Sequence, residues 1–104
     1  MQIDFLYFED CPSHEKALAR LQEVLEQESI QAEITVHQIE TDEQAQEWRF
    51  VGSPTILANG EDIIPTDETF YSLSCRVYQV DGRFSPLPTA EMIRAGLRRI
   101  LQQA

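Results

Sequence analysis

A short apolar run near the N-terminus constrains the fold of this chain more than any other feature. Residues 3–8, with the sequence IDFLYF, indicate a strand that is buried on both faces. A segment with the apolar spacing of a helix follows over residues 13–28, and an alternating segment over residues 32–39 predicts a second strand. A strand, a helix and a strand in this order form a right-handed crossover with parallel strands. This part of the chain therefore predicts an α/β fold.

The remaining elements predict a mixed sheet. We expect a short helix capped by Thr41, strands over residues 55–58 and 76–80, and a last helix capped by Thr89. The dipeptide Asn59-Gly60 is a strong hairpin signal, so the third and fourth strands should be antiparallel. The prediction is a single domain, residues 1–104, with the order β-α-β-α-β-β-α. Its mixed four-stranded sheet should carry helices on both faces.

The charge of the chain excludes one class of partner. Eighteen Asp and Glu residues against eight Lys and Arg residues give a net charge of −10. Proteins that bind nucleic acid need a basic surface, so we expect no nucleic-acid partner. No apolar run approaches the roughly 20 residues of a membrane span, and the acidic start lacks the basic region of a signal peptide. The expected location is the cytoplasm, with no membrane partner. We read the acidic side chains of residues 61–68 as solvated charges.

Cys11 is the residue best suited to chemistry. It lies where the first strand gives way to the first helix, and Pro12 should occupy the first helical position. Unpaired N–H groups at a helix N-terminus stabilise a thiolate, whereas Glu9 and Asp10 beside it have the opposite effect. His14 should lie one helical turn away and would support the thiolate as an imidazolium. We expect a reactive or ligand-binding thiol; the alternative is a small buried thiol that fills space.

The same residues argue against a resident metal. One thiolate and one imidazole do not make a tetrahedral zinc site, so we expect no metal site and no cofactor. His37 in the second strand should be an ordinary hydrogen-bonded residue. A soft ion such as Hg(II) or Cu(I) needs only two ligands and favours thiolates. A thiolate site for a soft metal or an organomercurial therefore stays open as an alternative.

Two motifs together resemble the thioredoxin/glutaredoxin-like superfamily. They are Cys11-Pro12 after the first strand and the sequence GSPT at residues 52–55 before the third. The resemblance covers nearly the whole chain and implies a minimal thioredoxin-like fold. More narrowly, GSPT, the Asn-Gly turn and the stretch LSCRVY at residues 73–78 resemble small bacterial thioredoxin-like proteins that carry an alkylmercury-lyase-related label.

The resemblance also implies roles for individual residues. Cys11 matches the nucleophilic cysteine of the family, and Pro54 matches the cis-proline that faces it. Ser53 would pair through its backbone with an extended substrate segment. Pro12 and Thr55 would complete the surface that binds the substrate.

The chain departs from the family at one important position. His14 stands where the family has its second cysteine, so the usual disulfide cannot form. A mixed disulfide formed on Cys11 must therefore be resolved by Cys75, by an external thiol such as glutathione, or by a partner protein. In a plain hairpin, Cys75 would lie roughly 15 Å from the active end at ~3.3 Å per residue. A disulfide tolerates about 7 Å between Cα atoms. Unless residues 61–74 fold back, Cys75 should be a small packed residue in the sheet.

These observations predict a thiol-based redox protein of the monothiol oxidoreductase kind. Cys11 would attack a disulfide or an electrophile, and His14 would tune its ionisation. An external thiol would release the product, with Cys75 as the candidate resolving thiol. The expected partners are a protein disulfide or a small thiol such as glutathione. The alternative from a different class is a non-catalytic module that binds a peptide in the groove at Pro54.

Overall fold

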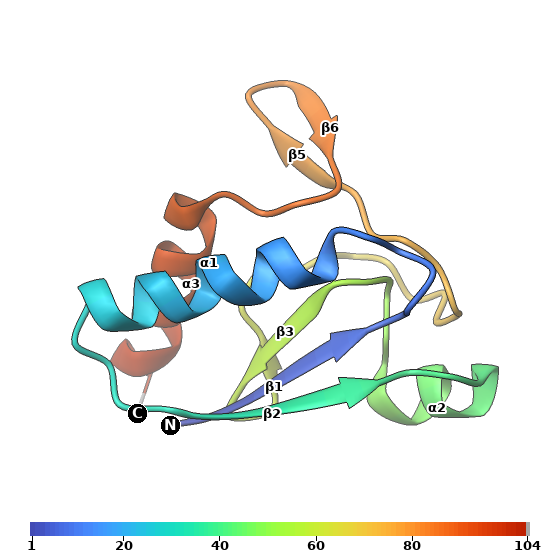
Figure 1. Cartoon of the computed structure of the whole chain (residues 1–104), viewed down its shortest axis with the longest axis horizontal. Helices are drawn as coiled ribbons and strands as arrows, with labels where there is room; N and C mark the ends of the chain where they lie inside the picture. The colour runs from blue at the N-terminus through green and yellow to red at the C-terminus, as the bar shows by residue number, and fades with distance from the viewer. Residues whose placement is uncertain (104) are drawn as a thin grey trace.

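A mixed sheet of four strands lies at the centre of the fold (Figure 1). The computed structural model describes residues 1–103, so Ala104 at the end of the predicted domain lies outside the described residues. The strands are β1 (Gln2–Tyr7), β2 (Glu33–Gln38), β3 (Thr55–Ala58) and β4 (Glu61–Asp62), in the spatial order β2-β1-β3-β4. β1 is parallel to β2 and antiparallel to β3, and β4 is antiparallel to β3. The predicted parallel crossover is confirmed.

Helices cover both faces of this sheet, as the hydrophobic pattern predicts. They are α1 (His14–Gln27), α2 (Asp42–Trp48) and α3 (Ala90–Gln102). α1 and α3 pack together on one face, where Ile3 and Phe5 of β1 join their core. Leu6 belongs to a second core with Ala45 of α2 and with Phe50. Because side chains alternate along a strand, β1 contributes to both cores.

The two threonine caps lie where the sequence predicts them. The hydroxyl of Thr41 accepts a hydrogen bond from the N–H of Gln44, and that of Thr89 accepts one from Met92. Such bonds satisfy N–H groups that have no partner within the helix.

The start of α1 differs from the prediction. Pro12 was expected at the first helical position, but Ser13 is the N-cap and the helix begins at His14. The N–H of Cys11 donates to the carbonyl of Phe8 at 3.0 Å, so the chain makes a turn before the helix can start. The hydroxyl of Ser13 donates to the carbonyl of Pro86 instead of capping the helix.

The fourth strand is also corrected. The strand that follows the Asn59-Gly60 turn and pairs with β3 is β4, not residues 76–80. Residues 78–80 instead form β5 (Tyr78–Val80), which pairs with β6 (Arg83–Ser85) in a separate hairpin that projects from the body (Figure 1). Asp-Gly is a hairpin dipeptide in the same way as Asn-Gly, and Asp81 and Gly82 both have positive φ.

Among the described residues, none of the helices combines the length and the apolar character needed to cross a membrane.

Candidate functional site

The two cysteines of the chain are bonded to each other. Cys11 and Cys75 form a disulfide with a Cα–Cα distance of 5.7 Å, although they are separated by 64 residues in sequence. The expectation that they lie roughly 15 Å apart is therefore wrong, and so is the packed position in the sheet expected for Cys75. The physical reason lies in the return segment, residues 63–77, which runs back from β4 to the start of β3 instead of continuing as a sheet strand.

The two sulfur-bearing residues differ in exposure. Cys11 is 1% exposed and lies in the turn between β1 and α1. Cys75 is exposed to solvent and lines a hollow of about 410 Å³ together with Val51, Phe70 and Val77. The disulfide therefore joins a buried residue to one at the surface.

His14 contacts Cys11 through the backbone. Its Nδ1 atom lies 2.9 Å from the carbonyl oxygen of Cys11. A carbonyl only accepts, so Nδ1 carries the proton and donates. The imidazole also stacks on the ring of Tyr7, with 4.4 Å between centroids. These contacts fix the orientation of the ring beside the turn that holds Cys11.

The residues of the GSPT motif lie beside the disulfide. The N–H of Ser53 donates to the carbonyl of Ser74 at 2.8 Å, and the N–H of Arg76 donates to the carbonyl of Ser53 at 3.0 Å. Ser53 and Cys75 thus form an isolated parallel β-bridge. The peptide bond between Ser53 and Pro54 is cis. The backbone that was expected to pair with a substrate segment is therefore paired with the chain itself.

The side chains of the motif are buried. Thr55 donates its hydroxyl hydrogen to the carbonyl of Gly52, and Pro54 has no significant exposure. The hydroxyl of Ser53 is buried and has no hydrogen-bond partner among the described residues. Pro12 is exposed, in the turn that follows Cys11. The structure thus brings Cys11, Cys75 and Ser53 together, while Pro12 stays at the surface.

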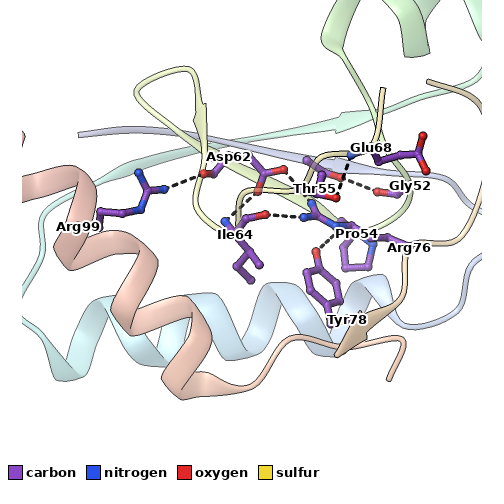
Figure 2. A network of polar contacts seen from close by, with 10 residues as sticks. Gly52, Pro54, Thr55, Asp62, Ile64, Glu68, Arg76, Tyr78 and Arg99 are labelled. Atoms are coloured by element: carbon purple, nitrogen blue, oxygen red, sulfur yellow. Dashed lines mark hydrogen bonds and ion pairs between the residues drawn. The ribbon is translucent and has the colours of Figure 1, made fainter. Parts of the chain in front are cut away.

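A buried polar network next to Cys75 was missed by the sequence reasoning. The side chain of Arg76 is 7% exposed; its guanidinium donates to the carboxylate of Asp62 at 2.9 Å and to the carbonyl of Ile64 at 2.6 Å (Figure 2). It also lies over the ring of Tyr78, whose hydroxyl donates to the carbonyl of Pro54. Asp62 was expected to be a solvated charge, and this expectation is wrong. The one hint in the sequence was that Arg76, next to Cys75, begins a predicted strand.

Burial changes the acidity of two members of the network. Desolvation raises the pKa of Asp62 above its ordinary value, although the charge of Arg76 opposes this shift. Desolvation also raises the pKa of Tyr78, which keeps its hydroxyl protonated as the donor to Pro54. The network therefore consists of a buried cation, its carboxylate partner and a neutral phenol.

Two further expectations concern the histidines and metals. His37 lies 2.9 Å from Asp4 and packs against Trp48, so the prediction of an ordinary hydrogen-bonded residue is confirmed. Within residues 1–103, no three side chains of the His, Cys, Asp or Glu type are grouped so that they could hold a metal ion.

No family model matches this chain, and neither a curated protein nor a solved structure does.

Proposed function

We propose that this chain is a thiol–disulfide redox protein whose reactive pair is Cys11 and Cys75. The observation that carries the proposal is the pairing of a buried cysteine with an exposed one across 64 residues of sequence. The hydrogen bonds of Ser53 to Ser74 and Arg76, on either side of Cys75, support the proposal because they hold Cys75 in place without using the sulfur atoms. The order of elements from β1 to β4 and the CP and GSPT motifs agree with a thioredoxin-like fold, which is part of the same proposal.

The exposures favour Cys75 as the entry point for exchange. An external thiolate reaches the sulfur of Cys75, forms a mixed disulfide with it, and breaks the bond to Cys11, which leaves as a thiolate. A second external thiol then attacks the mixed disulfide, so that an external disulfide leaves and Cys75 becomes a thiol. In this scheme two electrons pass from the external thiols to the protein. The sequence assigned the attack to Cys11, with resolution by another thiol; here Cys11 resolves, and Cys75 is the site of the mixed disulfide.

The reverse direction follows from the same steps. The thiolate of Cys75 attacks an external disulfide, forms a mixed disulfide with one half and releases the other half as a thiolate. The thiolate of Cys11 then attacks the sulfur of Cys75, releases the bound half as a second thiolate and closes the internal disulfide. His14 lies where it orients the turn of Cys11 by its bond to the carbonyl. We propose that His14 holds that turn in place while the disulfide of Cys11 opens and closes.

The binding alternative has less support. A peptide docked at Pro54 would use the backbone of Ser53, and Ser74 and Arg76 occupy that backbone. The soft-metal alternative is favoured by one observation: the two thiols of the reduced chain would be close enough to share a two-coordinate ion. Titration of the reduced chain with Hg(II), and of Cys11→Ser and Cys75→Ser, tests that alternative separately.

The test of the redox proposal is a single exchange step followed by acid quenching. The oxidised chain is mixed with reduced glutathione, free thiols are blocked, and the attached glutathione is located by mass spectrometry. We expect it on Cys75. Glutathione found on Cys11 would reverse the assigned roles, and a chain whose two cysteines never form a bond in glutathione buffers would overturn the function. Cys75→Ser is the matched control, because it retains Cys11 and cannot form the bond.

A further inference from the structure

Arg76 holds an unusual position for an arginine. Its side chain is almost fully buried, one residue along the chain from the exposed Cys75. A buried charge is costly unless it is paired and hydrogen-bonded. Here the charge is met by the carboxylate of Asp62 and by the carbonyl of Ile64. The planar, forked donor geometry of arginine suits two acceptors at once, which a lysine cannot reproduce.

Of the two acceptors, Asp62 belongs to the sheet and Ile64 to the start of the return segment. Asp62 is the last residue of β4, and the N–H of Ile64 donates to its carboxylate at 2.9 Å. On its far side, Arg99 of α3 donates to the carbonyl of Asp62 at 3.0 Å (Figure 2). The side chain of Arg76 therefore ties the return segment to a part of the molecule that is already fixed by the sheet and by α3.

We infer that Arg76 is a positioning residue for the redox pair: it keeps Cys75 beside Cys11 when the disulfide is open. The inference rests on the redox function proposed above. Two thiols joined only by a flexible chain meet with an effective concentration in the millimolar range. Anchoring of the reacting groups raises this value by orders of magnitude. The effective concentration of Cys75 at Cys11 then decides how readily the bond closes.

The backbone bonds of Ser53 provide only part of this anchoring. They form one isolated bridge of two hydrogen bonds, and isolated pairs of short strands are marginal in water. The side chain of Arg76 adds two charge-assisted hydrogen bonds on the C-terminal side of Cys75. Tyr78 adds a third anchor through Pro54. None of these contacts involves a sulfur atom, so they can persist in the reduced protein.

The experiment measures the equilibrium of the full chain with reduced and oxidised glutathione. The equilibrium constant, in molar units, is the effective concentration of the two thiols. We expect Arg76→Leu to lower it by about tenfold or more, since it removes two bonds to a charged group. Arg76→Lys should lower it by a smaller factor. Arg94→Leu is the matched control, since it removes a half-buried arginine of α3 whose bonds go to Glu28 and Gln27, away from Asp62 and the return segment, and it should stay within about twofold of the wild type.

The outcomes separate positioning from simple stabilisation. A residue that stabilises the oxidised and reduced forms equally leaves the glutathione equilibrium unmoved, whatever it does to unfolding. Values for Arg76→Lys and Arg76→Leu within twofold of the wild type would overturn the inference, and so would an equal fall in Arg94→Leu. If Arg76→Leu does not fold, Arg76→Lys decides. A wild-type chain that forms no disulfide overturns the redox function itself, whereas a normal wild type with unaffected variants overturns only the role of Arg76.

Discussion

Ser53 and Cys75 lie side by side in a parallel β-bridge, so the exposed cysteine is placed by backbone hydrogen bonds before any sulfur chemistry is considered. This relationship gives the first prediction. In a Cys11→Ser/Cys75→Ser double variant, the amides of Ser53 and Arg76 should remain protected from hydrogen exchange, within about tenfold of the oxidised wild type. Exchange of both amides at the rate of an unstructured peptide would show that the disulfide alone holds the bridge.

The glycine before Ser53 gives a second prediction. Gly52 has φ +129°, and a Cβ atom there would lie 2.7 Å from the backbone nitrogen of Arg76. Gly60 also has positive φ but has open space around it. Gly60→Ala should therefore cost about 1–2 kcal/mol for the backbone conformation alone. Gly52→Ala should cost at least about 1 kcal/mol more, because the return segment must also move away. Equal unfolding free energies by denaturant titration would contradict the close approach.

The raised pKa of Asp62 gives a third prediction, about stability in acid. Burial makes the folded state hold the proton of Asp62 more tightly than the unfolded state does. The quantity to compare is the unfolding free energy of the wild type minus that of Asp62→Asn. This difference should fall as the pH rises from the ordinary pKa of aspartate through the raised pKa of Asp62. Denaturant titrations of both proteins between about pH 3 and 6 measure this difference. A difference that grows with rising pH would reverse the sign and refute the assignment.

Glu28 should behave in the opposite way. Its hydrogen bond to Arg98 of α3, with added attraction from Arg94, holds the pKa of the carboxyl below its ordinary value. The stability that it contributes is present above the ordinary glutamate pKa and is lost as pH falls through the lowered one. The unfolding free energy of the wild type relative to Glu28→Gln should thus rise with pH across the acid range. Added salt should flatten that rise, because the carboxylate lies at the surface.

Acidic residues near the disulfide give a prediction about reductants. Glu9 and Asp10 are exposed beside Cys11, and Glu68 lines the hollow at Cys75. Three small thiols of different charge test this: cationic cysteamine, neutral mercaptoethanol and anionic mercaptopropionate. After correction for thiolate fraction, their rates of reducing the disulfide should fall in that order, by about threefold from each thiol to the next at low salt. High ionic strength should compress the series. Glu68→Gln tests the contribution of one carboxylate, and equal rates for the three thiols would refute the electrostatic argument.

Much of the fold could be predicted because it depends on local signals. The apolar run of β1, the caps at Thr41 and Thr89 and the Asn59-Gly60 turn all act over a few residues, and all lie where they were expected. The prediction that residues 76–80 pair with the third strand was wrong because apolar alternation does not say which sheet a strand joins. β5 instead pairs with β6 through the adjacent Asp-Gly turn.

The site was harder to predict than the fold. The sequence predicts Cys11 and the GSPT motif as candidate site residues. The close approach of Cys11 and Cys75 depends on the path of the return segment, which has no regular periodicity. Along that path, Arg76 pairs with Asp62 at the end of β4. Neither residue signals this pairing in the sequence, since isolated charges in polar segments are normally solvated.

The bond between the cysteines also makes a covalent ring of most of the molecule. The ring encloses α1, β2, α2, β3 and β4, whereas β1, the projecting hairpin and α3 lie outside the closed part. If the oxidised protein is pulled between residues 1 and 103, only the stretches 1–10 and 76–103 can be drawn out, because the covalent line of force passes through the disulfide and bypasses the backbone between the cysteines. Opening the bond puts the whole chain in the line of force. The redox state of two sulfur atoms thus sets the length to which this protein can be mechanically extended.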